Sequence, residues 1–363
     1  MRLCHLAAFI GLGSVSALVR GADPQPADPI AYPDHSNLLI VRDRQGDQRP
    51  ITSRADWDER RKHIRTNMEL VMGPVPDERR RVPLEVQIVS ETTTDKYVRI
   101  KLLYTPEPED RVSAWLLIPL ATPTNHKSAA MLCLHQTNHV GKDEPAGLAG
   151  LPALHYAHEL AGRGFVCLVP DYPSFGEYKY DFKTQGAHYA SGSMKAIWNN
   201  IRAVDLLVSR AEVDPHRIGA IGHSLGGHNA LFTAFFEPRL RAVVTSCGFT
   251  PFHDYYKGDM KGWTSDRYMP RIRDVYDNNA DRVPFDFYEI LAGLAPRSCY
   301  SNSPLHDSNF EVEGVRKAFQ KAEGVYKLLN AEGQLKLVTP DAQHDFPAVQ
   351  RQDAYRWLES QLK

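Results

Sequence analysis

Ser224 lies at the centre of Gly222-His223-Ser224-Leu225-Gly226, with a glycine two positions away on each side. The apolar run 217–221 before this segment is typical of a buried strand, and the run 229–234 after it is typical of a helix. A serine on a sharp turn between a strand and a helix forms a nucleophile elbow, in which the neighbouring positions must lack bulk. The pattern therefore predicts a nucleophilic Ser224, provided that the fold also supplies a base and an orienting carboxylate.

A carboxylate and a histidine follow Ser224 in the order that hydrolases with this turn use. Asp307 comes after the strand-like residues 298–300 and before a helix expected to begin near residue 311. His344 comes after the strand-like residues 335–338 and before a helix expected over residues 348–362. Because catalytic groups of parallel sheets gather at the carboxyl ends of the strands, we expect His344 to be the base and Asp307 to be the acid.

Other residues near these segments are alternatives for the same roles. Some hydrolases keep the acid after the sixth core strand, where this chain has Asp254, while Asp341 and Asp345 are better explained as loop or helix-start carboxylates. The other histidines near the proposed triad are poorly placed to be the base: His223 lies inside the elbow, His228 on the following helix and His306 beside the proposed acid.

A hydrolase of this kind also needs donors for the oxyanion of the tetrahedral intermediate. The backbone N–H of Leu225, directly after the nucleophile, is one expected donor. The second is expected after the strand-like residues 129–134, where the chain reads His135-Gln136-Thr137. The backbone of Gln136, the backbone of Thr137 and the Gln136 side-chain amide all remain candidates.

The run 213–227 resembles the serine-bearing α/β-hydrolases grouped with dienelactone hydrolase, acetyl xylan esterase and the prolyl oligopeptidase catalytic domain. Residues 163–176, Arg-Gly-Phe-Val-Cys-Leu-Val-Pro-Asp-Tyr-Pro-Ser-Phe-Gly, resemble the fourth strand of those proteins and the loop that follows it. The likeness covers roughly residues 84–363 and implies an α/β-hydrolase fold with a mostly parallel sheet between helices. Dienelactone hydrolases proper use cysteine where this chain has Ser224, and prolyl oligopeptidases carry a propeller domain for which this chain has no room.

Residues 249–290, after the sixth core strand, form an aromatic-rich insertion. Aromatic rings above the site could stack against sugar rings, and we expect Trp263 and Tyr268 to bind substrate in this way. The alternative is that the aromatic residues pack a cap onto the sheet, because rings of this size are usually part of the core.

Composition excludes several other classes of protein. The chain has 363 residues, of which 42% are hydrophobic and 24% charged, and its net charge is −1. Because nucleic acids and anionic membranes are bound by concentrated basic faces, we expect neither as a partner. No metal or organic cofactor is expected, since His155, His158 and Glu159 lack further converging ligands. The sequence sets no oligomeric state.

The N-terminal residues 1–22 have the charge, the apolar stretch and the small residues of a secretory signal peptide. We therefore expect a secreted or periplasmic protein without a membrane span once this segment is removed. Residues 23–83 are expected to be an extension that is irregular up to residue 50 and then forms a helix from about Ala55 to Met72, as a lid or a brace. Residues 84–363 are the expected catalytic domain, and the alternating segments near residues 84–89, 97–104 and 113–118 predict antiparallel strands at its start. Four cysteines remain after the signal peptide, and we expect free thiols: Cys133, Cys167, Cys247 and Cys299.

The sequence thus predicts a serine hydrolase that cleaves a carboxylic ester through an acyl-enzyme. A small-molecule or carbohydrate ester is the expected substrate, carrying an acetyl or uronic-acid ester group. The alternatives are a small serine peptidase without a propeller and a non-catalytic sugar-binding relative.

Overall fold

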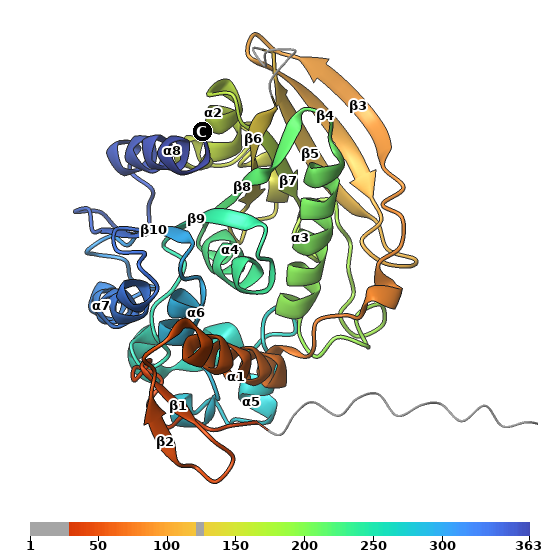
Figure 1. Ribbon diagram of the computed structural model, residues 1–363. Helices are drawn as coiled ribbons and strands as arrows, with labels where there is room; N and C mark the ends of the chain where they lie inside the picture. Colours follow the sequence, from red (N-terminus) through yellow and green to blue (C-terminus); the bar gives the residue numbers. More distant parts are fainter. Residues whose placement is uncertain (1–28, 121–126) are drawn as a thin grey trace, which may run out of the picture.

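The computed structural model describes residues 29–120 and 127–363, and their main element is a nine-stranded sheet. Its strand order is β11-β10-β9-β8-β6-β7-β5-β4-β3 (Figure 1). The expected signal peptide lies outside the described residues. The strand bounds are β3 Gln87–Thr93, β4 Tyr97–Tyr104, β5 Val112–Pro119, β6 Ser128–Leu134, β7 Val166–Pro170, β8 Val213–His223, β9 Leu240–Ser246, β10 Ser298–Asn302 and β11 Leu335–Val338.

Strands β6 to β11 pair in parallel, whereas β3, β4 and β5 are antiparallel to their neighbours. This confirms the predicted mostly parallel α/β-hydrolase sheet with antiparallel opening strands. The first strand begins at residue 87 and not at the expected residue 84. Its apolar residues Ile88 and Val89 are exposed at the edge of the sheet, so the pattern of apolar residues does not mark where this strand begins and ends.

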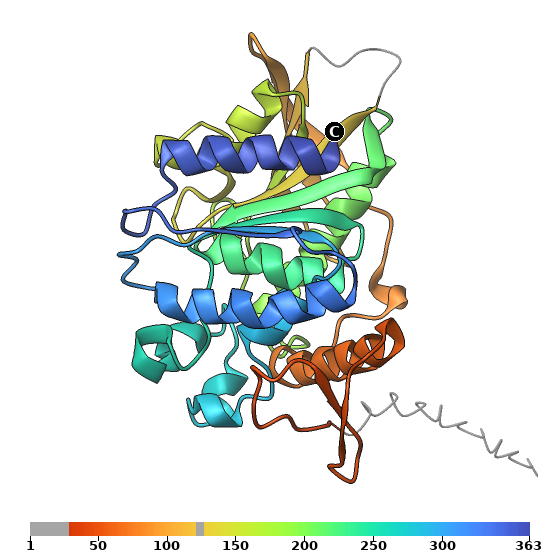
Figure 2. The same ribbon diagram turned by 60° about the vertical axis from the view of Figure 1, so that its left-hand side comes forward.

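Helices cover both faces of the sheet (Figures 1 and 2). One face packs against α2 (Tyr156–Gly162) and α8 (Ala348–Leu362), and the other packs against α3 (Gly192–Ser209), α4 (Leu225–Phe236) and α7 (Val312–Leu328). Alternate residues of β6 enter the two cores: Met131 and Cys133 on the α8 side, Leu132 and Leu134 on the α4 side. The sheet therefore holds the loops at its strand ends against a core on each face.

The N-terminal extension is more regular than predicted. A two-stranded hairpin of β1 (Ile40–Arg42) and β2 (Gln48–Pro50) interrupts the segment that we expected to be irregular. Strands of three residues are too short to leave a periodic pattern. Helix α1 (Arg54–Met72) then begins in a capping box of Ser53 and Asp56 and ends at Gly73, whose φ of 89° suits glycine.

Helix α1 has the contacts expected of a brace. Its buried Arg60 forms an ion pair with the equally buried Glu289 of α6 (Phe287–Gly293), and Arg61 donates to the carbonyl oxygen of Gly293. In Figure 1 the helix lies beside α5 (Arg271–Asp274) and α6, on the side away from α8. The extension is thus fastened to the segment that follows the sixth core strand, β9.

The aromatic-rich segment 249–290 folds as short helical turns: η4 Tyr255–Gly258, η5 Met260–Trp263, α5 and η6 Ala280–Arg282. Four of its rings are fully buried and pack together, as the alternative reading of this segment expected: Phe249, Phe252, Phe285 and Phe287.

The four described cysteines are free and buried, as predicted. Within the two described ranges, no helix is long and apolar enough to cross a membrane.

Candidate active site

Ser224 sits in a strained turn between β8 and α4. Its φ of 53° and ψ of −118° lie in a region that L residues seldom adopt, and its N–H donates to the carbonyl oxygen of Ser246 over 2.8 Å. Such strain costs of order 1–3 kcal/mol and persists where the surroundings enforce it. The serine predicted from the motif therefore has the backbone geometry of a nucleophile elbow.

The two flanking glycines are required by close backbone contacts. A Cβ atom on Gly222 would lie 2.2 Å from the backbone of Gly226, and one on Gly226 would lie 2.0 Å from the carbonyl oxygen of Leu134. The spacing of the motif thus reflects how tightly α4 packs against the ends of β6 and β8.

His344 and Asp307 form a hydrogen-bonded pair beside this turn. Nδ1 of His344 lies 2.9 and 3.0 Å from the two carboxylate oxygens of Asp307, and the Asp307 side chain is almost fully buried. Burial raises the pKa of Asp307, but the bonds from His344 and from the Asn309 N–H outweigh it and lower that pKa below its usual value. An ionised Asp307 accepts a hydrogen bond from the Nδ1–H group and leaves Nε2 of the ring for another partner.

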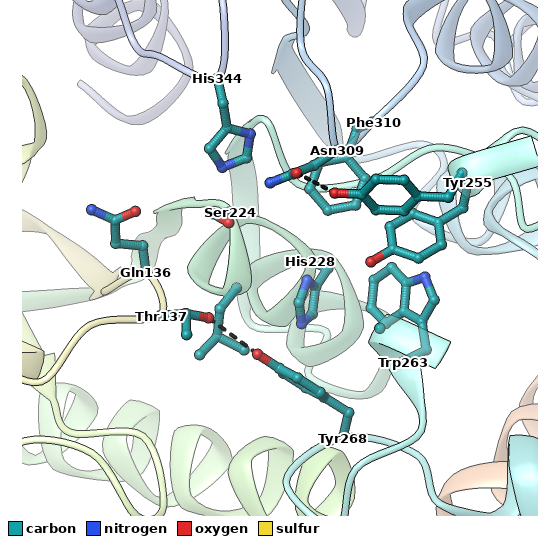
Figure 3. A pocket seen from close by; sticks show the side chains of 13 residues that line it. Gln136, Thr137, Ser224, His228, Tyr255, Trp263, Tyr268, Asn309, Phe310 and His344 are labelled. Atoms are coloured by element: carbon teal, nitrogen blue, oxygen red, sulfur yellow. Dashed lines mark hydrogen bonds between the residues drawn. The ribbon is translucent and has the colours of Figure 1, made fainter. Parts of the chain in front are cut away.

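In Figure 3 a ring nitrogen of His344 is turned toward the Ser224 hydroxyl. The structure thus brings together the three side chains that the sequence proposed as a triad. The alternative acids lie elsewhere: Asp254 pairs with Lys317, Asp341 pairs with His306, and Asp345 is exposed.

The proposed oxyanion residues lie next to Ser224. Leu225 is the first residue of α4, and the first N–H groups of a helix have no partner within it. The Gln136 amide nitrogen donates to Oε1 of Glu144 over 3.1 Å, and Figure 3 shows it pointing away from Ser224. The backbone N–H groups of Gln136 and Thr137 therefore remain as the better candidates.

Tertiary contacts fix the turn that carries these groups. His135 Nε2 accepts the N–H of Tyr172, so its Nδ1 carries the proton and donates to the carbonyl oxygen of Gln136. In a planar trans peptide, this directs the Thr137 N–H away from His135.

A pocket of about 310 Å³ opens in front of Ser224 (Figure 3). Every predicted site residue lines it except Asp307, which lies behind His344. The lining residues are Gln136, Thr137, Ser224, Leu225, His228, Tyr255, Tyr256, Gly262, Trp263, Tyr268, Asn309, Phe310 and His344.

Two hydrogen bonds join opposite walls of the pocket (Figure 3). Tyr268 and Thr137 share one between their hydroxyl groups at 3.1 Å, and the Tyr256 hydroxyl donates to the Asn309 side chain. The segment 249–290 thereby contacts both the loop after β6 and the loop after β10.

Sequence reasoning missed several residues of the site. His228 was considered only as a base, although its position four residues after Ser224 on α4 places both on one helix face. Asn309 and Phe310 follow Asp307 closely, but only the fold shows that they turn back toward His344.

His223, inside the elbow, packs edge to face against His344 with ring centroids 4.9 Å apart. Burial and the neighbouring His344 lower the pKa of His223 to about 3, so this ring is neutral near pH 7. It therefore supports the His344 ring without adding charge to it.

Cys247 is a further neighbour of the acid and base. Its sulfur and the ligand atoms of Asp307 and His344 all lie within 4.8 Å of one another, close enough to hold a metal ion. The same contacts suit a second role, because a thiol at Asp307 helps to keep the carboxylate ionised.

Comparison with known proteins places this chain in a family. A model described as the prolyl oligopeptidase family matches residues 154–363, more than half of the chain. The chain belongs to the prolyl oligopeptidase family. It is therefore a serine hydrolase with the α/β-hydrolase fold, as the sequence predicted.

One sequence relative and two solved structures align with most of this chain. YtaP of Bacillus subtilis is 26% identical over 306 residues, which are 80% of this chain and 96% of YtaP. A glucuronoyl esterase from Solibacter usitatus has a TM-score of 0.70 at 16% identity and covers 93% of this chain and 100% of its own. An acetyl xylan esterase from Paenibacillus sp. R4 has a TM-score of 0.58 at 18% identity, covering 86% and 96%.

Proposed function

We propose that this serine hydrolase cleaves carboxylic esters of carbohydrates, with Ser224 as nucleophile, His344 as base and Asp307 as acid. The main support is the His344–Asp307 hydrogen-bonded pair, because it leaves the second ring nitrogen facing the strained serine. Fold neighbours named as glucuronoyl and acetyl xylan esterases are consistent with this substrate class.

The proposed reaction has two acyl-transfer steps. His344 accepts the proton of Ser224 as its oxygen attacks the ester carbonyl, and the imidazolium is stabilised by Asp307. The resulting oxyanion is bound by the Leu225 N–H and by a backbone N–H of the Gln136–Thr137 turn. The imidazolium then protonates the leaving alcohol, and water activated by the same ring releases the acid and restores Ser224.

Peptide hydrolysis is the competing activity, and it must be tested because the chain belongs to the prolyl oligopeptidase family. A peptidase that binds a free amino terminus needs a carboxylate to hold the ammonium group. None of the described residues lining the pocket is Asp or Glu. The lining therefore favours an uncharged ester over a charged amino terminus.

Four substrates separate these activities: p-nitrophenyl acetate, an acetylated xylo-oligosaccharide, a glucuronic acid ester and the p-nitroanilide of Gly-Pro. We expect ester hydrolysis that is lost in Ser224→Ala, with kcat/KM for the esters far above that for the anilide. Faster cleavage of the anilide would replace the proposal with a peptidase, and no turnover of any ester would refute it.

We also propose that the enzyme acts outside the cytoplasm. The sequence pattern of residues 1–22 supports export. Expression of the full chain with N-terminal sequencing of the exported protein tests this, and we expect a mature N-terminus near residue 18 or 23. An intact N-terminus on protein retained in the cytoplasm would contradict it.

A further inference from the structure

Two buried polar side chains in the pocket wall, His228 and Trp263, lack a well-formed hydrogen bond among the described residues. His228 is 5% exposed and Trp263 is 3% exposed. Neither ring nitrogen of His228 makes a hydrogen bond of normal geometry with the described residues, and the same holds for Nε1 of Trp263. Buried polar groups are normally paired, so an exception in a binding pocket points to a group that the ligand supplies.

These two side chains form one patch. Their rings meet edge to face with centroids 4.8 Å apart, and Tyr268 lies against both, at 5.9 Å from His228 and 6.4 Å from Trp263. Figure 3 shows the imidazole between Ser224 and Trp263. The patch is thus next to the reacting serine, where the part of a substrate beside the ester would lie.

Three other polar side chains of the same pocket already have partners. The Gln136 amide is bound by Glu144, Tyr268 by Thr137, and Tyr256 by Asn309. The nitrogens of His228 and Trp263 differ from these groups because they are buried and unpaired.

The chemistry of the patch selects the kind of group it binds. Burial lowers the pKa of His228 to about 3, against a smaller opposing effect of the Gly248 backbone, so the ring is neutral with one donor and one acceptor. The indole of Trp263 adds a donor. None of the described lining residues is Lys, Arg, Asp or Glu, so the wall lacks a counter-charge for an ionised ligand.

We propose that His228 and Trp263 form a subsite for the free hydroxyl groups of a neutral, partly acylated sugar, adjacent to the ester that Ser224 attacks. A hydroxyl both donates and accepts, which matches the imidazole, and a second hydroxyl accepts from the indole N–H. The torsion that turns the imidazole is soft, so a ring nitrogen can rotate toward the ligand. This inference rests on the proposed esterase activity and restricts it to uncharged sugar units with a free hydroxyl.

The test compares the hydrolysis of two acetate esters by the same enzyme. One is a methyl xyloside carrying a single acetyl group and free hydroxyls, and the other is p-nitrophenyl acetate, which has no hydroxyl. The variants are His228→Leu, His228→Asn and Trp263→Phe, with His253→Leu as the control because His253 is exposed in the same segment. The readout is the ratio of kcat/KM for the xyloside ester to kcat/KM for p-nitrophenyl acetate.

We expect this ratio to fall about tenfold to a hundredfold in His228→Leu and Trp263→Phe, because each variant removes hydrogen bonds to the sugar. It should recover in part in His228→Asn and stay unchanged in His253→Leu. The deacetylated methyl xyloside should also inhibit p-nitrophenyl acetate hydrolysis less strongly in His228→Leu and Trp263→Phe.

An unchanged ratio in His228→Leu and Trp263→Phe would overturn the subsite, whether both esters keep their activity or lose it equally. Wild-type activity on p-nitrophenyl acetate without activity on the xyloside ester would refute the subsite alone. Inactivity on every ester in the substrate panel would instead refute the proposed function itself.

Discussion

Asp307 is distinguished clearly from the other carboxylates that could be the acid of the triad. It is buried and bonded to His344 Nδ1, whereas Asp254, also considered from the sequence, is bound to Lys317 on α7. The carboxylate would fix the imidazole tautomer and stabilise the imidazolium that forms during attack.

Replacing Asp307 by Asn should lower kcat by roughly 10³–10⁴-fold, because the amide can neither balance the imidazolium nor enforce the correct tautomer. The matched change Asp254→Asn should leave kcat within about twofold. Steady-state kinetics on p-nitrophenyl acetate, with circular dichroism to verify folding, measures both. A large loss in Asp254→Asn with an active Asp307→Asn would reassign the acid.

At the residue scale, the chemistry-bearing side chains were predictable and their surroundings were not. Ser224, Asp307 and His344 lie in local patterns of strand, turn and helix that a sequence displays. The choice among oxyanion donors depended on Glu144, which reaches Gln136 only through the fold. His228 was weighed only as a base, because the poor pairing of its buried ring nitrogens is visible only in three dimensions.

The loop after β6 is the element that shapes the proposed oxyanion site. The turn reads His135-Gln136-Thr137, so a long side chain stands beside the oxyanion site. The buried Glu144 holds the loop by three bonds: from the Gln136 amide, from the Asn138 amide and from the Leu151 N–H. Glu144 thus keeps the Gln136 side chain away from the serine.

Replacing Glu144 by Ala should therefore lower kcat by about 10–100-fold with a smaller change in KM, because the oxyanion is stabilised mainly in the transition state. The change Glu144→Gln should retain part of the activity. Glu323→Ala, at an exposed position on α7, is the control. A rise in KM at unchanged kcat would show that the loop binds substrate and does not shape the oxyanion site.

The bounds of long elements with clear start and stop residues were predicted closely, whereas those of short or exposed elements were not. The last helix covers residues 348–362 as expected, because its apolar stripe faces a core. The hairpin of β1 and β2 escaped prediction, since three-residue strands carry no periodic signal. Edge strand β3 was shifted because both of its faces are exposed.

At the scale of the whole molecule, the N-terminal extension and the segment 249–290 stabilise each other. Arg60 and Glu289 are fully buried, Arg60 lies over the Tyr32 ring at 3.1 Å, and His35 Nδ1 is 2.9 Å from Glu289. Removing one partner of such a buried pair leaves an uncompensated charge.

Glu289→Gln should lower the free energy of unfolding by about 3–5 kcal/mol, because Arg60 would remain buried without its carboxylate. The exposed change Glu323→Ala should cost less than about 0.5 kcal/mol. Urea denaturation measures both values. A loss below about 1 kcal/mol in Glu289→Gln would show that the extension is not a brace.

Acid should destabilise the protein in part through its buried histidines. The pKa of His223 and of His228 is lowered to about 3 by burial, whereas an unfolded histidine titrates near 6.5. The stability that each contributes is therefore complete above pH 6.5 and is lost as the pH falls toward 3, by about 1.4 kcal/mol per pH unit.

The change His228→Leu should reduce the slope of unfolding free energy against pH by about that amount between pH 6 and pH 4. His253→Leu, at an exposed position, should leave the slope unchanged. Urea unfolding at a series of pH values tests this. Equal slopes for wild type and His228→Leu would show that His228 is protonated in the folded protein.

The role of Ser224 as the nucleophile is tested most directly by the intact mass of the folded protein after reaction with a fluorophosphonate probe, beside Ser224→Ala. We expect one covalent adduct on the wild type and none on the variant, because only an activated serine reacts. An unmodified wild type, or an adduct that persists in Ser224→Ala, would contradict the assignment of Ser224 as the nucleophile.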